Sequence, residues 1–172
     1  LLEQAAYHPG CVYIRMPRKP EQRVYQGDEH ITLGKANLLR DGSDMAILAT
    51  GFVMVPEAIK AADLLAREGI RAAVVDFHTI KPLDTQVLHH WAKRTNCIVT
   101  MENHQVSGGF GGAVAEYLGQ NLPTPVLRIG IEDRFGQVGS QDYLMRDYGL
   151  TAEQISPRII KYYREMKRTG GG

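Results

Sequence analysis

The residues best suited to chemistry in this chain are an acid and an imidazole, Glu102 and His104, which follow the apolar run Cys97–Met101. A histidine changes its charge near neutral pH, and a neighbouring carboxylate favours the charged form, so the two could transfer protons. No nucleophile stands beside them in the sequence, which favours a hydrogen-bonded pair that holds a turn or meets another domain. His78 presents the same alternatives, and there a structural role is favoured more strongly.

A glycine-rich turn follows these two residues. Gly108, Gly109, Gly111 and Gly112 precede the apolar pattern of a helix at 113–118. Backbone N–H groups at such a turn can cradle a phosphate. A dinucleotide site, however, places its glycines after the first strand and an acid about twenty residues later, whereas these glycines follow a later strand. Close packing of the helix against the sheet is therefore favoured over a nucleotide site.

Two arginines offer a different chemistry. Arg15 and Arg18 flank Met16-Pro17 at the end of the apolar run Cys11–Met16. A guanidinium group stays charged and donates hydrogen bonds in a fixed fork that suits a phosphate. Two arginines at the end of a strand are more often solvated, so the pattern alone leaves both possibilities open.

These groups need a sheet to position them, and the sequence predicts one with an antiparallel edge. The run Ile31–Leu39 leads to Asp41-Gly42, a common hairpin sequence, and Asp44–Thr50 is the next strand. Because a hairpin joins antiparallel strands, we expect one antiparallel edge strand.

Strands and helices then alternate along the chain. Pro56 suits the first turn of a helix, and Gly69 suits the position just beyond its end. Ile70–Phe77 is almost wholly apolar, as expected of a strand covered on both faces, and Asp84 can cap the following helix. Further strands are predicted at 97–101 and 126–129, and two last helices from Ser140 and from Ser156-Pro157.

Short connections and right-handed crossovers between such elements give a three-layer α/β fold. Its sheet is mainly parallel with one antiparallel edge strand, and helices cover both faces. The carboxyl edge of an open α/β sheet is where ligands bind. We expect the following residues along this edge: Thr50-Gly51, His78-Thr79, Glu102–His104 and Asp133.

The composition bounds the class of protein. With 172 residues, of which 44% are hydrophobic, the chain can form one sizeable core. The formal net charge of +1 gives no reason to expect a nucleic acid or a membrane surface as a partner, and no apolar stretch has the length of a membrane span. Cys11 and Cys97 lack the spacing of a metal site and are expected to be reduced thiols of a cytoplasmic protein.

The first residues suggest a division into parts. Leu1–Tyr7 has the composition of the end of a helix, and Cys11–Met16 predicts a strand without a partner nearby in the sequence. A lone strand cannot satisfy its own backbone hydrogen bonds. We therefore expect residues 1–16 to be the remnant of an upstream domain, 17–30 to be a linker, and 31–169 to be the main domain.

Several short segments, in their shared order, resemble the carboxy-terminal domain of the transketolase family. Tyr13–Arg18 looks like the last strand of the family's pyrimidine-binding domain, and Thr79–Asp84 is similar to transketolases of the divided type, whose second half is a separate chain. Asn103 departs from the family, which often has a second glutamate before the histidine. The other similar segments are Asp41–Gly51, Glu102–Gly112, Gly130–Gly136 and Tyr148–Ile155.

The resemblance implies the carboxy-terminal part of an enzyme that transfers a two-carbon ketol unit between sugar phosphates in pentose phosphate metabolism. The chemistry belongs to thiamine diphosphate with Mg²⁺ or Ca²⁺. The family binds this cofactor between two other domains, so no residue here is assigned to cofactor or metal. Arg15 matches the position whose arginine binds the substrate phosphate, with Arg18 as a weaker companion.

The resemblance also implies partners. An amino-terminal transketolase domain or subunit completes the enzyme, and the assembly is a dimer or another homo-oligomer. Because both cofactor-binding domains lie outside this sequence, the isolated chain is expected to be an assembly domain without activity.

Three other interpretations stay open. Deoxyxylulose phosphate synthase and the beta subunit of 2-oxoacid dehydrogenases share this domain. The first usually has a different sequence before Lys81–Asp84, and the second acts on unphosphorylated acids and has less use for Arg15. The third is a binding module without chemistry, which a complete pyrimidine-binding domain upstream would exclude.

Overall fold

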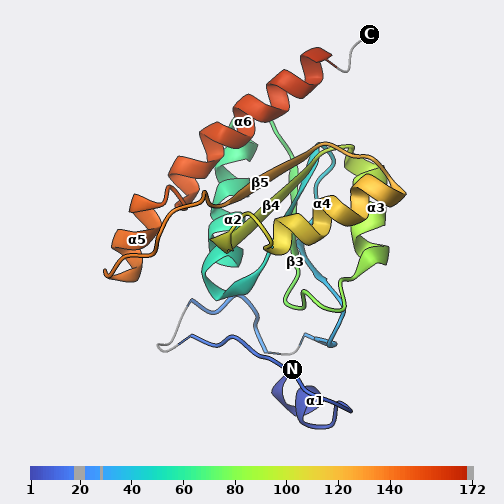
Figure 1. The fold of residues 1–172 in the computed structure, drawn as a ribbon. Helices are drawn as coiled ribbons and strands as arrows, with labels where there is room; N and C mark the ends of the chain where they lie inside the picture. Colours follow the sequence, from blue (N-terminus) through green and yellow to red (C-terminus); the bar gives the residue numbers. More distant parts are fainter. Residues whose placement is uncertain (18–21, 28, 170–172) are drawn as a thin grey trace.

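The computed structural model describes residues 1–17, 22–27 and 29–169, and they form a three-layer α/β fold (Figure 1). The strands are β1 (Asn37–Arg40), β2 (Met45–Ala49), β3 (Ala72–Asp76), β4 (Ile98–Gln105) and β5 (Val126–Ile131). They form one sheet in the order β1-β3-β2-β4-β5, in which β1 is antiparallel and the other strands are parallel. The fold class predicted from the sequence is therefore confirmed.

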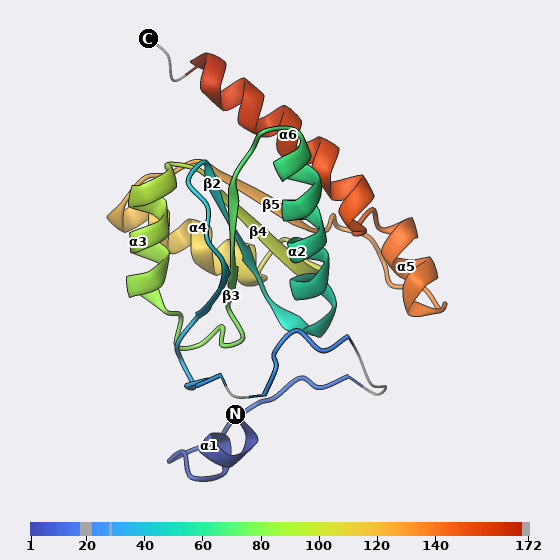
Figure 2. The same ribbon diagram turned by 180° about the vertical axis from the view of Figure 1, so that it is seen from behind.

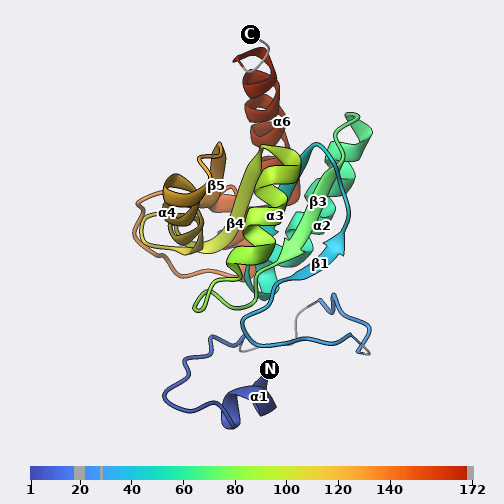
Figure 3. The same cartoon turned by 90° about the vertical axis from the view of Figure 1, so that its right-hand side faces the viewer.

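Helices cover both faces of this sheet (Figures 2 and 3). α2 (Gly51–Arg67) and α6 (Ala152–Thr169) pack on one face, and α3 (Thr85–Thr95) and α4 (Phe110–Asn121) pack on the other. The short helix α5 (Gln141–Asp147) leads into α6. None of the described helices combines the length and the apolar character that a membrane span requires.

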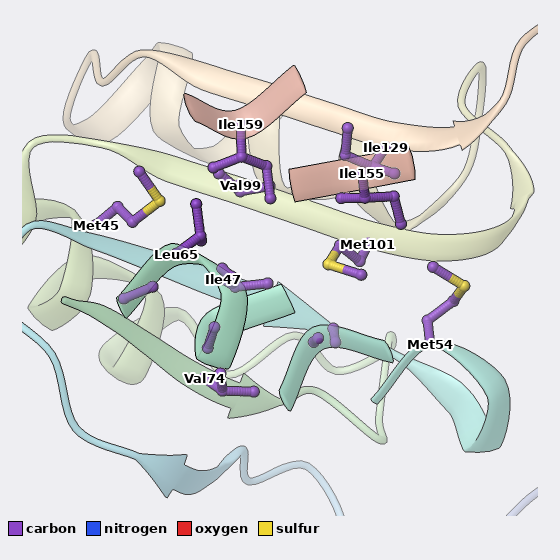
Figure 4. Packing of buried hydrophobic residues seen from close by; sticks show 14 of the residues in the cluster. Met45, Ile47, Met54, Leu65, Val74, Val99, Met101, Ile129, Ile155 and Ile159 are labelled. Carbon is purple, nitrogen blue, oxygen red and sulfur yellow. The ribbon is translucent and has the colours of Figure 1, made fainter. Parts of the chain in front are cut away.

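The core has two halves because successive side chains of a strand point to opposite faces of the sheet. In β2, Met45 and Ile47 belong to the cluster under α2 and α6, whereas Ala46 and Leu48 belong to the cluster under α3 and α4. Figure 4 shows the first cluster, in which Ile159 of α6 lies over the strands. A strand buried on both faces is apolar throughout, which is the pattern that predicted β3.

The predicted hairpin between the first two strands is wrong, although the antiparallel edge is confirmed. β1 pairs with β3 and not with β2, so the connection crosses the start of β3. Gly42 makes this crossing possible, because a Cβ at this position would overlap backbone atoms of Ala72 and Ala73. The next two N–H groups both donate to the carbonyl of Arg71 at 3.0 Å, which fixes the crossing in place.

Two helices begin earlier than their prolines predicted. α2 starts before Pro56 and α6 starts before Ser156-Pro157, so each proline is the sixth helical residue. A proline inside a helix removes a backbone hydrogen bond, but both helices gain more from an earlier start. The residues just before Pro56 are buried against the sheet, and the first N–H of α6, from Ala152, donates to the carboxylate of Glu57 at 2.6 Å.

The other helix signals are confirmed. Asp84 caps α3 by accepting a hydrogen bond from the N–H of Val87 at 3.2 Å. Ser140 caps α5 in the same way, with the N–H of Tyr143 at 3.3 Å. Gly69 follows the last turn of α2 with φ of 76°, a backbone conformation that favours glycine.

The N-terminal segment, residues 1–17 and 22–27, lies next to the carboxyl edge of the sheet in Figures 1 and 2. Its predicted helix is confirmed as α1 (Leu2–Ala6), and Gln4 forms hydrogen bonds with the backbone of Ile31 and Leu33 at 2.6 and 2.7 Å. The strand predicted at Cys11–Met16 is wrong, because no strand in the described part of the chain lies alongside to pair with it. The division into a remnant, a linker and a main domain stays a prediction.

The crossing at Gly42 gives a test of the sheet order. Gly42→Ala should lower the free energy of unfolding by about 1–3 kcal/mol, because the new methyl group has no space against the start of β3. Gly119→Ala is the matched control: it lies in α4 with open space around it, and should be neutral or stabilise by up to about 1 kcal/mol. Urea unfolding of the 172-residue chain measures both. A tolerated Gly42→Ala would contradict the crossing.

Candidate functional site

The carboxyl ends of three adjacent parallel strands form the candidate site, and they face the N-terminal segment (Figure 1). Thr50, directly after β2, donates to the carbonyl of Phe77, directly after β3, at 2.8 Å. Gly51 lies beside Asn103 of β4. The predicted grouping of these strand ends at one edge is therefore confirmed. Asp133 follows β5 at the same edge and is exposed, with φ of 42°.

Glu102 is buried at the start of α4. The residue is 2% exposed, and its two carboxylate oxygens accept hydrogen bonds from the N–H groups of Phe110 and Gly111 at 2.7 and 2.8 Å. The first N–H groups of a helix lack partners within the helix and carry partial positive charge, so a carboxylate there is strongly favoured. Glu102 is thus a helix cap supplied by a strand.

His104 lies apart from this cap. Its side chain is exposed, and Nδ1 is 3.0 Å from the carbonyl oxygen of Gln105. Within the described residues no hydrogen bond joins Glu102 to His104, so the structure does not bring the predicted acid–base pair together. The turn predicted at these residues is instead the end of β4, whose pairing with β5 shifts register between Met101 and Gln105.

The glycines allow α4 to sit directly on Glu102. A Cβ at Gly109 would overlap the Glu102 carboxylate, and a Cβ at Gly111 would lie 2.5 Å from Oγ1 of Thr100. Gly108 has φ of 73°, which favours glycine at the turn before the helix. Gly109 and Gly111 therefore serve close packing of helix against strand, as the sequence favoured, whereas a Cβ at Gly112 would make only an ordinary contact at 4.0 Å.

Arg15 reaches the same edge from the N-terminal segment. Its guanidinium is exposed, and Nη1 donates a long hydrogen bond of 3.4 Å to Oδ1 of Asn103. Arg18, the second predicted phosphate ligand, lies outside the described residues. No local pattern predicts Asn103 as the partner of Arg15, since 88 positions separate them.

A second contact, which was not predicted from the sequence, joins the N-terminal segment to the edge. The hydroxyl of Tyr25 donates to Oδ2 of Asp76 at 2.7 Å and accepts from Nδ2 of Asn37 at 3.3 Å. One feature of the sequence could have indicated this contact, namely an acid, Asp76, at the carboxyl end of an apolar strand. Oδ1 of Asp76 and Nε2 of His78, on the same edge, are buried and have no hydrogen-bond partner among the described residues.

Burial dominates the charge states of these groups. It raises the pKa of Asp76, and the hydrogen bond from Tyr25 and the nearby His78 act in the opposite direction. Burial also raises the pKa of Tyr25, and its bond to Asp76 raises it further. The pKa of His78 is lowered by burial, against the attraction of Asp76. Burial at this end of β3 therefore shifts all three pKa values in the direction that favours the neutral form.

The geometry defines a class of protein: an α/β domain with helices on both faces, in which an arginine from a preceding segment reaches the carboxyl edge of the sheet. Residues 34–155 match the family described as transketolase, C-terminal domain. The match covers more than half of the chain, which therefore belongs to the transketolase C-terminal domain family.

The relatives place the chain among carboxy-terminal parts. The 6-deoxy-6-sulfo-D-fructose transketolase subunit of Clostridium sp. (strain MSTE9) is 49% identical over 152 residues, which are 88% of this chain and 47% of that protein. The putative transketolase C-terminal section of Methanocaldococcus jannaschii is 42% identical over 171 residues, 98% of this chain and 52% of that protein. The chain thus spans about half the length of these relatives.

Two further comparisons bear on the alternatives. A solved structure named as a split gene transketolase, inactive beta4 tetramer, has a TM-score of 0.86 and 39% identity, and covers 93% of this chain and 51% of that chain. The 1-deoxy-D-xylulose-5-phosphate synthase of Thermomicrobium roseum is 42% identical over 160 residues, 91% of this chain but 25% of that protein. The two transketolase relatives therefore match in about half of their own length, against a quarter for the synthase, whereas the identity of 42% is the same for the Methanocaldococcus jannaschii protein and the synthase.

The cap at α4 can be tested by removing the carboxylate. Glu102→Ala should lower the free energy of unfolding by roughly 2–5 kcal/mol, because two buried N–H donors lose their partner. Glu116→Gln, which removes a charge from an exposed position of the same helix, should change it by less than about 0.5 kcal/mol. Urea unfolding measures the free energy of both variants. If Glu102 were a dispensable carboxylate at the edge and not a cap, the two substitutions would have equally small effects.

The buried carboxyl of Asp76 gives a pH prediction. Its pKa is raised in the folded chain, so its stabilising contribution is present below the unfolded value, about 3.9, and is lost as pH rises through the folded value. Asp76→Asn removes this loss. The variant should therefore gain unfolding free energy relative to the native chain as pH rises from about 4 to about 7.

Denaturant titrations across this pH range measure the difference. Asp142→Asn is the control, because its side chain is exposed at the start of α5. A constant difference between Asp76→Asn and the native chain would show that Asp76 keeps its ordinary pKa.

Proposed function

We propose that this chain is the carboxy-terminal part of a transketolase, which transfers a two-carbon ketol unit between sugars that carry a terminal anion. Family membership and the names of the two divided relatives support this proposal. The amino-terminal part of the enzyme is the proposed partner, in a cytoplasmic enzyme of pentose phosphate metabolism. The chain alone is an assembly domain without activity, which the name of the inactive beta4 tetramer supports.

The cofactor, thiamine diphosphate with Mg²⁺ or Ca²⁺, is assigned to domains outside this chain. The residues described here do not fit it. The helix start at Phe110 and Gly111 is already occupied by the carboxylate of Glu102, so its N–H groups are not available to a diphosphate. The described residues also hold no group of three or more His, Cys, Asp or Glu side chains that could bind a metal ion.

Arg15 is the residue of this chain that best supports the proposal. Its exposed guanidinium lies at the carboxyl edge, where open α/β sheets bind ligands, and only a long hydrogen bond to Asn103 holds it. We assign it to the terminal phosphate of the sugar, with Arg18 as a companion. The alternative is that Arg15 has this role in a deoxyxylulose phosphate synthase. This alternative is weaker, because the chain covers only 25% of that relative.

Besides a phosphate, a second anion is a candidate for the charged end of the sugar. The relative with 49% identity is named as a 6-deoxy-6-sulfo-D-fructose transketolase subunit. Its named substrate carries a sulfonate where a sugar phosphate carries a phosphate. A guanidinium donates to the oxygens of either group, so Arg15 suits both substrates.

Substitution of Arg15 tests the proposed function in the assembled enzyme. Arg15→Ala should lower kcat/KM for a sugar phosphate by about ten- to a hundredfold, because a hydrogen bond to a charged group is lost. The loss should be small for an analogue without the terminal anion. Parallel assays with a 6-sulfo sugar identify which anion the site prefers.

Arg67→Ala is the matched control. Its side chain is exposed at the far end of α2, away from the carboxyl edge, so both substrates should keep their native kcat/KM. If Arg15→Ala reduced the activity equally on charged and uncharged substrates, Arg15 would be a structural residue and the assignment would fail.

A further inference from the structure

The connection between β5 and α5, residues 132–140, contains no helix or strand, but side chains hold its backbone in place. The carboxylate of Asp147, at the end of α5, accepts hydrogen bonds from Nη2 of Arg134 at 2.8 Å and from Nε2 of Gln137 at 2.7 Å. The hydroxyl of Tyr148 accepts a hydrogen bond from the N–H of Gln137 at 3.2 Å. The guanidinium of Arg134 also lies over the ring of Tyr148, 4.9 Å from its centroid. The connection therefore has a fixed conformation.

The apolar side chains of this connection are exposed. Phe135 and Val138 are fully exposed (101% and 100%), more than any other large apolar residue in the described part of the chain. Tyr143 of α5 is 48% exposed and lies beside them, because a Cβ at Gly139 would be 2.5 Å from its ring. Single exposed apolar residues are common, whereas a group of them on a fixed backbone is typical of a surface that another protein covers. We call Phe135, Val138 and Tyr143 the β5–α5 surface.

This surface lies at the carboxyl end of the domain. Nε2 of Gln105, at the end of β4, donates to the carbonyl of Arg134 at 2.7 Å and so attaches the connection to the sheet edge. Gln22 of the N-terminal segment and Asp142 of α5 line one cleft together with the start of α2. In Figures 1 and 2, α5 is on the side of the N-terminal segment, at the opposite end of α6 from the C-terminus. The β5–α5 surface is thus at the end of the domain to which Arg15 also belongs.

We propose that the β5–α5 surface binds the amino-terminal part of the enzyme, with Phe135 as the side chain that enters a pocket on that part. The proposal rests on the proposed function and names the contact surface for its partner. The two divided relatives contain about as much chain again as this one, so a second body of similar size belongs to them. In the proposed function that body carries the cofactor while Arg15 holds the charged end of the sugar, so it must reach the carboxyl edge.

The charges around the surface favour this partner over a second copy of the chain. Within residues 132–143, Glu132 and Arg134 form ion pairs with residues of α6 and α5, and the two charged residues without an ion pair in the described chain are acids, Asp133 and Asp142. A two-fold contact between copies would bring the same acids toward each other, and like charges oppose such a contact. The partner's pocket is therefore expected to be apolar, with basic groups at its rim.

Phe135→Ala tests the proposal in a titration of this chain with the amino-terminal part of the enzyme. The dissociation constant should rise by about ten- to a hundredfold, as when an aromatic anchor is removed from an interface. The free energy of unfolding of the isolated chain should not change, because the side chain is fully exposed there. Isothermal titration calorimetry measures the first quantity and urea unfolding the second. Phe135→Leu, which keeps an apolar side chain, should raise the dissociation constant by less than about fivefold.

Leu38→Ala is the matched control. Leu38 is 54% exposed on β1, which is the opposite edge of the sheet from β5, so the substitution removes an exposed apolar side chain far from the β5–α5 surface. The dissociation constant should then stay within about twofold of the native value.

The outcomes separate this proposal from the proposed function. An unchanged dissociation constant in Phe135→Ala, with a native chain that assembles into an active enzyme, would overturn the role of the surface and leave the proposed function intact. If Phe135→Ala reduced only the self-association of the isolated chain in sedimentation, the surface would be a contact between copies and the proposal would fail. In an assembled enzyme without ketol transfer, the proposed function would fail, while a raised dissociation constant in Phe135→Ala would still support the surface.

Discussion

The burial of the Glu102 carboxylate against the start of α4 constrains the rest of the carboxyl edge. A buried carboxylate is costly unless strong donors satisfy it, and two N–H groups at a helix start do so. The contact requires the helix backbone to approach the strand closely, and Gly109 and Gly111 make this possible. One interaction therefore accounts for the glycines and for the direction of α4.

The same interaction explains why the glycine-rich turn does not behave as an anion site. A helix start after glycines is a common place for a phosphate, and here a side chain of the protein already occupies it. Because Glu102 turns to one face of the sheet, Asn103 must turn to the other. The amide of Asn103 therefore lies on the side from which Arg15 approaches.

Local patterns predicted the elements well, and long-range contacts decided what the patterns left out. The apolar runs of β2 and β3, the cap at Asp84 and the glycine at Gly69 each depend on a few neighbouring residues, and all were predicted. The partner of β1 was not, because Asp41-Gly42 fits a hairpin locally and only the packing against β3 shows otherwise. Prolines likewise mark where a hydrogen bond is missing, while burial decides where a helix begins.

The same distinction applies to the site. Residue types placed Glu102 and His104 at one sheet edge, but did not place Arg15 there. The contacts that join the N-terminal segment to this edge are distant in the sequence: 51 positions separate Tyr25 from Asp76 and 88 separate Arg15 from Asn103. Both contacts attach the N-terminal segment to the ends of β3 and β4. The guanidinium of Arg15 stays exposed at this edge, where a long hydrogen bond joins it to Asn103. In the function proposed above, this guanidinium binds the charged end of the substrate while the bond-making chemistry takes place on another part of the enzyme.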